Sequence, residues 1–291
     1  ENLLATVQPG VTNLGISDHV RPLGLFYAPD PSSQIACTIG GNVAENSGGV
    51  HCLKYGLTVH NVRGIEVVTA TGEILRLGGE ALDSVGYDLL ALMHGSEGML
   101  GIVVEVVVKL LPQPEAVTVV LAAFPTAGAA GDAVSAIIRE GILPAGLEMM
   151  DQAAIRAAEA FAHAGYPTDA GAILLCELDG LRESVAAELV ALRLLLSEMG
   201  ASDVREASGD AERARMWQGR KAAFPAVGRL SPDYYCMDGT IPRRELSSVL
   251  ALITALSEKH NLRVANVFHA GDGNLHPLIL YDANVGDELA R

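Results

Sequence analysis

Two histidines flank a short polar turn near the end of the chain, in the stretch His269-Ala270-Gly271-Asp272-Gly273-Asn274-Leu275-His276. An Asp-Gly pair favours a tight hairpin, so the strands on either side of it would lie next to each other. Both imidazoles could then point at one metal ion. The spacing is also compatible with a polar hairpin tip that carries two unrelated histidines.

A separate basic segment is the stretch Trp217-Gln218-Gly219-Arg220-Lys221. A single arginine on a helix is usually a solvated charge, and Lys221 can likewise be a surface residue. The residues by themselves therefore assign no chemistry to Arg220.

Glycine is densest in Thr38-Ile39-Gly40-Gly41-Asn42-Val43-Ala44-Glu45-Asn46-Ser47-Gly48-Gly49, and a second cluster spans Gly95–Gly101. Glycine lets the backbone approach a ligand and adopt positive φ, so that N–H groups can meet phosphates or ring heteroatoms. Neither cluster is a G-x-G-x-x-G between a strand and a helix, and no Walker-type G-K-[ST] is present, which disfavours nicotinamide and P-loop sites. A large, mostly uncharged ligand such as a flavin remains, as does the alternative that both clusters are tight turns.

The composition excludes several classes of function. With 35 acidic and 20 basic residues the formal net charge is −15, which disfavours nucleic acid and anionic membranes as partners. No apolar run is long enough to span a bilayer, so no transmembrane segment is expected. Four widely spaced cysteines without a C-x-x-C predict reduced thiols in a cytoplasmic protein rather than a disulfide framework or an iron–sulfur centre. They are Cys37, Cys52, Cys176 and Cys236.

The elements that must position these residues form two predicted domains, 1–113 and 114–291, with the boundary at Pro112 and Pro114. In the first, a hairpin is expected at Thr71-Gly72-Glu73, and the alternation from Ile102 to Leu110 predicts a strand with the even-numbered residues on one face. In the second, helices alternate with strands, and the hairpin near Asp272 requires antiparallel pairing. The fold class is therefore predicted as α+β rather than Rossmann.

The second domain is expected to contain long helices capped by Thr126 and Asp151, a helix stop at Gly200, and a helix start at Pro242. Expected strands are 117–123, 146–150, 172–178, 234–240, 263–268 and 276–281. Expected helices are 127–140, 152–163, 181–199, 211–224 and 243–260.

Five motifs, in order, resemble the FAD domain of the vanillyl-alcohol-oxidase/PCMH superfamily. They are Val7–Asn13, Tyr27–Ser33, Thr38–Gly49, Lys54-Tyr55-Gly56 and Gly95–Ile102. Downstream, Phe224-Pro225 and the stretch Ser231–Asp238 look like the glycolate oxidase-like subgroup of FAD-linked 2-hydroxy-acid dehydrogenases. The resemblance implies a PCMH-type FAD-binding domain followed by an FAD-linked oxidase C-terminal substrate domain with a mainly antiparallel sheet.

In such proteins a further glycine-rich loop that cradles the pyrophosphate precedes the first of these motifs. The chain begins at Glu1 and stops within an acidic helix start at Gly286–Arg291, so it is expected to be a fragment that lacks both ends. The resemblance implies that the following residues line the flavin: Pro29, Asp30, Pro31, Ser32, Ser33, Thr38, Gly40, Gly41, Asn42, Asn46, Gly48, Tyr55, Gly56, Glu97, Gly98 and Ile102.

The resemblance also implies the reaction. Arg220 would grip the substrate carboxylate as a fork, with Asn274 touching the substrate. His269 and His276 would bind a divalent zinc, iron or manganese ion, completed by a Glu from a later Glu-His-Gly segment whose His is the general base. Flavin N5 would take the hydride. Electrons would pass to companion flavin and iron–sulfur subunits or a quinone, which would place the protein in the cytoplasm or peripherally at the inner membrane.

Four rival interpretations are distinguished by substrate or by class. Within the family these are D-lactate and D-2-hydroxyglutarate dehydrogenases. Because Ser231–Asp238 contains no Lys or Arg, a second substrate carboxylate has no evident partner, which favours a small monoacid such as glycolate or lactate. Outside it are a metal-dependent hydrolase built on the histidine pair and a non-catalytic flavoprotein subunit that acts as a scaffold.

Overall fold

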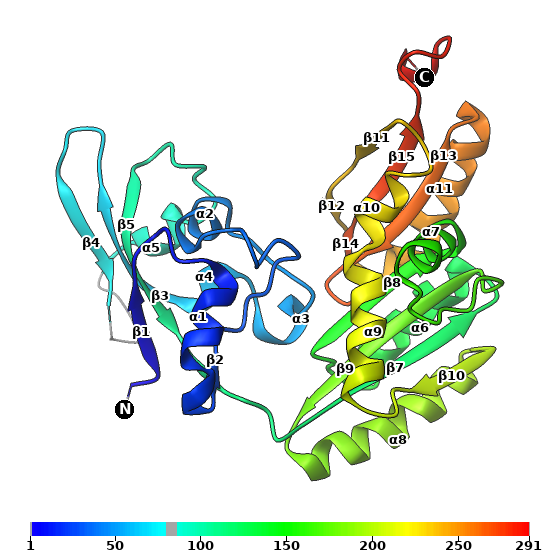
Figure 1. The fold of residues 1–291 in the computed structure, drawn as a ribbon, viewed down its shortest axis with the longest axis horizontal. Coiled ribbons are helices and arrows are strands. Elements are labelled where there is room, and N and C mark those ends of the chain that lie inside the picture. The colour runs from blue at the N-terminus through cyan, green and yellow to red at the C-terminus, as the bar shows by residue number, and fades with distance from the viewer. Residues whose placement is uncertain (1, 80–85, 291) are drawn as a thin grey trace. The chain divides into compact units, whose positions relative to one another are not determined.

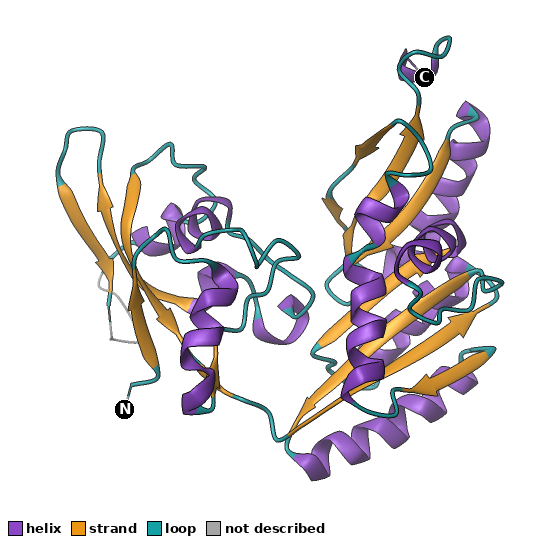
Figure 2. Cartoon of the chain, viewed as in Figure 1, coloured by secondary structure: helices purple, strands orange, loops and turns teal. Residues whose placement is uncertain are grey.

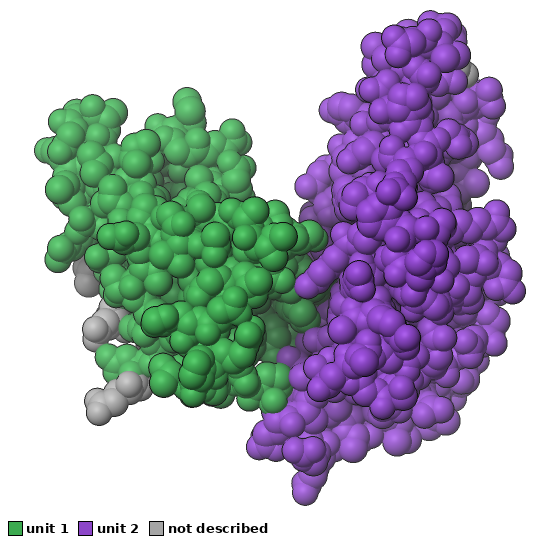
Figure 3. All heavy atoms as spheres, viewed as in Figure 1, with its two compact units in different colours: residues 1–114 green, residues 115–291 purple. Residues whose placement is uncertain are grey.

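The computed structural model describes residues 2–79 and 86–290, and the chain divides into two compact units, Glu1–Pro114 and Glu115–Arg291 (Figures 1 and 3). Each unit has its own antiparallel sheet with helices packed on it (Figure 2). Within the described part of the chain, no helix combines the length and the apolar character needed to cross a bilayer.

The first unit is built on a four-stranded antiparallel sheet in the order β1-β5-β3-β4. Its strands are β1 (Leu4–Val7), β3 (Val62–Val68), β4 (Ile74–Gly78) and β5 (Ile102–Lys109), with the short pair β2 (Leu25–Phe26) and β6 (Leu111–Pro112). Its helices are α1 (Asn13–Val20), η1 (Arg21–Leu23), α2 (Ile39–Glu45), α3 (Cys52–Tyr55), α4 (Thr58–Asn61) and α5 (Leu89–Met93). The core forms where Ile16 of α1 and Ile39 and Val43 of α2 pack with Val67 and Val106 of the sheet.

Two predictions for this unit differ in outcome. The hairpin at Thr71-Gly72-Glu73 is confirmed, since β3 and β4 pair antiparallel across it. The alternation along β5 holds at Val106 and Val108, which are buried, but Val103 rather than Val104 pairs with β3 and packs against the core. The cause is a register shift in the pairing with β3, because an extra residue in one strand moves the following side chains to the other face.

The second unit contains a seven-stranded sheet in the order β10-β7-β9-β8-β13-β15-β11, with antiparallel neighbours throughout. Its strands are β7 (Ala116–Phe124), β8 (Gly146–Asp151), β9 (Ala172–Gly180), β10 (Asp203–Glu206), β11 (Asp233–Cys236), β13 (Arg263–Phe268) and β15 (Pro277–Tyr281). The short strands β12 (Gly239–Thr240) and β14 (Asn274–Leu275) pair separately. The expected antiparallel sheet is confirmed.

Helices cover both faces of this sheet (Figure 2). One group is α6 (Ala127–Arg139), α8 (Arg182–Glu198) and α11 (Leu246–His260), the last preceded by η2 (Arg243–Glu245). The other group is α7 (Gln152–Ala162), α9 (Asp210–Lys221) and α10 (Ala223–Val227), and η3 (Glu288–Ala290) lies near the end of the chain. The helix that was expected to run from Ala211 to Phe224 is thus broken after Lys221. Pro225 explains the break, because it has no N–H to donate to the carbonyl of Lys221.

Two further predictions for this unit are corrected. The strand expected over 234–240 is two strands, because β11 pairs with β15 whereas β12 pairs with β14. Pro242 has an extended ψ of 129° and precedes η2 instead of occupying the first helical position.

Both predicted N-caps are confirmed. The side chain of Thr126 accepts the Ala129 N–H at 3.1 Å, and Asp151 Oδ1 accepts the Ala154 N–H at 2.9 Å. Asp151 does more, since its Oδ2 also accepts the backbone N–H and the side-chain amide of Asn266 in β13, at 2.9 and 2.8 Å. The start of α7 is therefore tied to a strand far away in the sequence.

We expect Asp151→Ala to destabilise the second unit by about 2–4 kcal/mol, because it removes a cap and strands two buried donors of Asn266. Thr126→Ala, which removes a cap alone, should cost about 1 kcal/mol. Urea unfolding followed by the fluorescence of Trp217, the only tryptophan of the chain, measures both. Equal losses in the two variants would show that the bonds to Asn266 contribute nothing.

Candidate functional site

The register of the sheet brings the histidine pair next to a buried acid. β13 pairs with β8 in a register that, continued by one residue, sets His269 opposite Glu148. A backbone bridge between His269 and Asn274 closes the turn. His276 follows Asn274 by two residues, so it lies diagonally across from His269 on the same face of the sheet.

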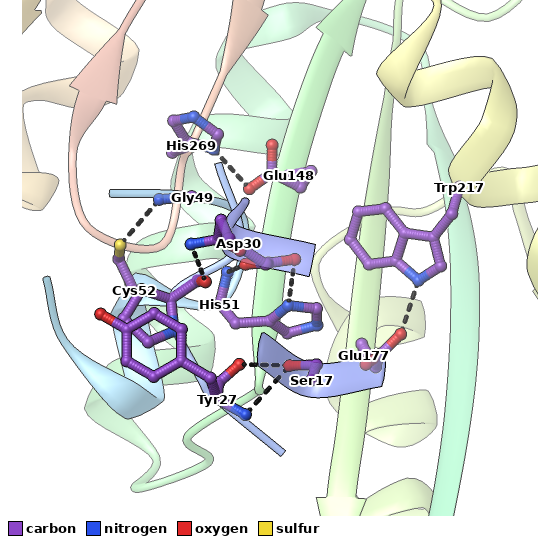
Figure 4. A network of polar contacts seen from close by, with 12 residues as sticks. Ser17, Tyr27, Asp30, Gly49, His51, Cys52, Glu148, Glu177, Trp217 and His269 are labelled. Carbon is purple, nitrogen blue, oxygen red and sulfur yellow. Dashed lines mark hydrogen bonds and ion pairs between the residues drawn. The ribbon is translucent and has the colours of Figure 1, made fainter. Parts of the chain in front are cut away.

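Glu148 joins the arginine to this hairpin. Its side chain is 1% exposed, and its Oε1 lies 2.8 Å from Nδ1 of His269, within hydrogen-bonding distance (Figure 4). Its Oε2 forms an ion pair with Arg220 Nη2 of α9 at 2.6 Å. The side chain of Arg220 is 2% exposed, so the interpretation of Arg220 as a solvated surface charge is wrong. Its contact with a substrate stays a prediction.

The two imidazoles lie close together. Their ring centroids are 5.2 Å apart with the planes nearly perpendicular. Nδ1 of His276 lies 3.5 Å from Oδ1 of Asp238, and the ring of Phe224 packs against His276 with a centroid distance of 5.8 Å. Each histidine therefore has a carboxylate beside Nδ1.

The surroundings shift the pKa of the two histidines in opposite directions. Burial lowers the pKa of His269, but the charge of Glu148 and the hydrogen bond to it outweigh burial, so that the net pKa is raised. Burial and the neighbouring charge of His269 lower the pKa of His276. The neutral form of His276 is therefore favoured, and its lone pair can bind a metal or accept a proton.

Two buried polar atoms beside this cluster have no hydrogen-bond partner among the described residues. They are Oδ1 of Asn274 and Nε of Arg220. Most buried polar atoms are hydrogen-bonded, and exceptions need a physical explanation. A bound polar ligand that both donates and accepts hydrogen bonds would satisfy them.

The described residues contain no group of three or more His, Cys, Asp or Glu side chains arranged to hold a metal ion. His269 and His276 are the two imidazoles that the sequence predicted as ligands. The surroundings of His269 resemble those of metal-binding histidines, whose other ring nitrogen usually contacts a carboxylate. In His269 that nitrogen is Nδ1, which lies 2.8 Å from Oε1 of Glu148.

The sequence analysis missed Glu148 and a second buried acid, Glu177. Glu177 on β9 accepts the indole N–H of Trp217 at 2.5 Å (Figure 4). Helix α9 is therefore bonded to the sheet by both Trp217 and Arg220. The signal for both acids was a glutamate inside a short apolar run that was itself expected to be a strand. Because Glu is rarely buried without a partner, such a residue predicts a buried donor nearby.

A groove of about 390 Å³ opens in the first unit between the two glycine clusters. Its lining includes five residues that were predicted to contact flavin: Thr38, Gly40, Gly41, Gly98 and Ile102. Pro9, Gly10, Ala44, Ser96, Gly101 and Val103 complete it. The structure therefore brings together three motifs that are widely separated in the sequence.

The first glycine cluster contains the start of a helix, whereas the alternative left open by the sequence was a tight turn. Thr38 is the N-cap of α2, and its hydroxyl accepts the Gly41 N–H at 3.4 Å. A Cβ at Gly40 would lie 2.7 Å from Cβ of Pro9, so glycine is required there for close packing. A Cβ at Gly41 would meet only the Thr38 hydroxyl, at an ordinary 3.5 Å, so the space above Gly41 belongs to the groove.

Three other predicted flavin residues make structural hydrogen bonds. Buried Asn42 accepts the side-chain amide of Asn13 at 3.1 Å, and Asn46 accepts the Val59 N–H at 3.0 Å. Asp30 accepts from His51 Nδ1 at 2.8 Å (Figure 4). The remaining predicted residues lie outside the lining of the groove: Pro29, Pro31, Ser32, Ser33, Gly48, Tyr55, Gly56 and Glu97.

Two protein families match the chain. Residues 113–291 match the family described as FAD linked oxidases, C-terminal domain, and residues 1–78 match the family described as FAD binding domain. Among solved structures, alkyldihydroxyacetonephosphate synthase aligns with a TM-score of 0.78 at 20% identity, over 96% of this chain and 57% of that one. p-Cresol methylhydroxylase aligns with a TM-score of 0.75 at 17% identity, over 100% of this chain and 64% of that one. These similarities confirm the α+β fold with a PCMH-type first part.

Curated relatives match along the whole chain. Glycolate oxidase subunit GlcD of Escherichia coli (strain K12) is 66% identical over 287 residues, which are 99% of this chain and 58% of that protein. The subunit of the same name in Bacillus subtilis (strain 168) is 44% identical over 100% of this chain and 62% of that protein. D-lactate dehydrogenase of Anaerostipes hadrus is 34% identical over 95% and 60%. The chain thus spans about three fifths of the length of these relatives, and it belongs to the family of FAD-linked oxidases.

Proposed function

We propose that the protein containing this chain is an FAD-dependent dehydrogenase that oxidises a small 2-hydroxy acid, glycolate or D-lactate, to the 2-oxo acid. The observation that carries the proposal is the cluster of Arg220, His269 and His276 on one face of the second sheet, in a chain of the FAD-linked oxidase family. The names of its relatives, glycolate oxidase subunit and D-lactate dehydrogenase, support this substrate class.

The groove of the first unit is the proposed flavin site. Its lining consists mostly of small residues and contains no charged side chain, which suits a flat, mostly uncharged ring system. FAD bound there supplies the hydride acceptor of the reaction. The other residues that resemble flavin contacts, from Pro29 to Ser33 and from Asn42 to Gly56 together with Glu97, are proposed to hold the rest of the cofactor.

The substrate is proposed to bind beside Glu148 in the second unit. Arg220 would hold the carboxylate of the acid, since its Nε has no hydrogen-bond partner within the described residues. The amide oxygen of Asn274 would accept a hydrogen bond from the substrate hydroxyl. Both contacts would satisfy polar atoms that are otherwise buried at a cost.

His269 and His276 are proposed to hold a divalent zinc, iron or manganese ion through Nε2. Such an ion lowers the pKa of the substrate hydroxyl and so eases loss of its proton. A further glutamate ligand and a histidine base would come from outside these 291 residues. Within this chain, the two imidazoles would contribute their Nε2 lone pairs as ligands of the ion.

The reduced flavin must be reoxidised, and this chain offers no cluster for electron transfer among its described residues. Its four cysteines lie at separate places in the fold and form no disulfide with one another. We propose that electrons pass to companion flavin and iron–sulfur subunits of a glycolate oxidase-like complex or to a quinone, which the description of two relatives as glycolate oxidase subunits supports. Such partners would place the protein in the cytoplasm or at the inner membrane.

We expect Gly41→Leu in the full-length protein to weaken FAD binding roughly 5- to 150-fold, because overfilling a packed site typically costs about 1–3 kcal/mol. The fold should tolerate the change, since the Cβ position is open and glycine is a poor helix former. Flavin absorbance after dialysis measures retention. Glu45→Leu on the same helix, outside the groove, is the matched control. Full retention by Gly41→Leu would place the flavin elsewhere.

We expect Arg220→Lys to raise the KM for glycolate roughly 10- to 150-fold, because it loses a charge-assisted fork worth about 1.5–3 kcal/mol. The neighbouring exposed residue supplies the control, since Lys221→Gln removes a charge without touching the cluster. Steady-state kinetics compare the two. An unchanged KM in Arg220→Lys would remove this side chain from the substrate site.

His276→Ala should instead lower kcat by more than about a hundredfold, because metal activation of an oxygen is worth several kcal/mol in the transition state. FAD content should stay normal, since His276 belongs to the second unit. Metal analysis, flavin absorbance and kinetics on one preparation test this together. If the variant keeps its metal and its kcat, His276 is not a metal ligand and the hairpin is only a structural turn.

A further inference from the structure

Glu148 touches both halves of the proposed hydroxy-acid site through one carboxylate. We infer that it is a positioning residue, which fixes the tautomer of His269 and holds the guanidinium of Arg220 at the same time. The inference rests on the proposed function for the roles of its two neighbours. The contacts of Glu148 with His269 and Arg220, however, can be tested on the protein without metal, flavin or substrate.

The tautomer follows from which atoms can donate. The guanidinium of Arg220 is always charged and carries only donors, and its Nη2 lies 2.6 Å from Oε2 of Glu148, the geometry of an arginine–carboxylate ion pair. An ionised carboxylate only accepts hydrogen bonds, so the 2.8 Å contact between Oε1 and Nδ1 of His269 requires a hydrogen on Nδ1. In neutral His269 the lone pair is then on Nε2, the atom that can bind a metal or take a proton.

The backbone around Glu148 makes this arrangement rigid. The carboxylate projects from β8 and not from a loop, and it is 1% exposed. The Gly271 N–H donates to the Leu147 carbonyl at 2.9 Å, so the histidine hairpin is bonded to β8 next to Glu148. Arg243 Nη1 donates to the Gly271 carbonyl at 3.0 Å and holds the turn from the other side. A displacement of Glu148 would therefore move His269 and Arg220 together.

Glu177 provides a natural comparison. It lies on the adjacent strand β9, points to the same helix α9, and accepts the indole N–H of Trp217. A glutamine at Glu177 can still accept that bond through its amide oxygen. A glutamine at Glu148 has one oxygen for two donors, so its NH2 must face either Arg220 or His269. Facing His269, it would force the hydrogen from Nδ1 to Nε2.

The first test measures the tautomer directly. Side-chain ¹⁵N shifts of histidine are recorded on the full-length, metal-free protein without substrate, at a pH high enough for the His269 ring to be neutral, since its pKa is raised. His269→Gln assigns the signals. We expect Nε2 of His269 to appear as the acceptor nitrogen and Nδ1 as the protonated one. The opposite assignment overturns the inference, even if hydroxy-acid oxidation is confirmed. Conversely, absence of that activity would leave the measured tautomer intact.

The second test compares Glu148→Gln with Glu177→Gln. We expect Glu148→Gln to lower zinc affinity roughly 10- to 100-fold and to shift the His269 signals, because partners of metal ligands tune binding to that extent. The KM for glycolate should rise together with the loss of zinc affinity. Glu177→Gln should change none of these. Wild-type zinc affinity, an unaltered tautomer and an unchanged KM for glycolate in folded Glu148→Gln would together overturn the inference, because the amide NH2 must disturb either His269 or Arg220. If that variant does not fold, the wild-type tautomer decides.

Discussion

A buried carboxylate on a central strand of the sheet constrains much of the second unit. Taking Glu148 out of water costs several kcal/mol, which only charged or hydrogen-bonding partners can offset. Those partners are Arg220 from α9 and His269 from the hairpin, so three distant segments must meet at one point. Removing one partner of a buried pair typically costs about 3–5 kcal/mol. The polar cluster thereby helps to select one arrangement of helix and hairpin.

A second buried acid, Glu177, also bonds to helix α9. Trp217 and Arg220 lie one turn apart on α9, and each reaches a glutamate on a neighbouring strand. Because hydrogen bonds are directional whereas apolar packing is not, these two contacts define the rotation of α9 about its axis. The guanidinium consequently faces the histidine pair and not solvent.

In the first unit, close backbone packing at two glycines shapes the proposed ligand groove. Gly101 has a φ of +159°, and a Cβ there would lie 2.4 Å from Cγ1 of Val67, so the backbone of the second glycine cluster lies directly on β3. Gly40 allows a similar approach of α2 to Pro9. These two close backbone contacts flank the groove, whose lining residues are mostly small. A groove of this shape suits a flat ligand better than an ion.

The sequence by itself determined the elements whose signals are local. Periodicity and caps placed α6, α7 and β13 within a residue or two, and the turn chemistry of Asp272-Gly273 predicted the hairpin with both imidazoles. The ordered glycine motifs indicated the family. Local patterns could not show the groove lining, the bulge in β5, or the partner of Arg220, because each depends on strand register and helix docking between segments far apart in the chain. Whether Arg220 is a surface charge or a buried one was decided by tertiary structure alone, since only the packed sheet places the carboxylate of Glu148 within reach.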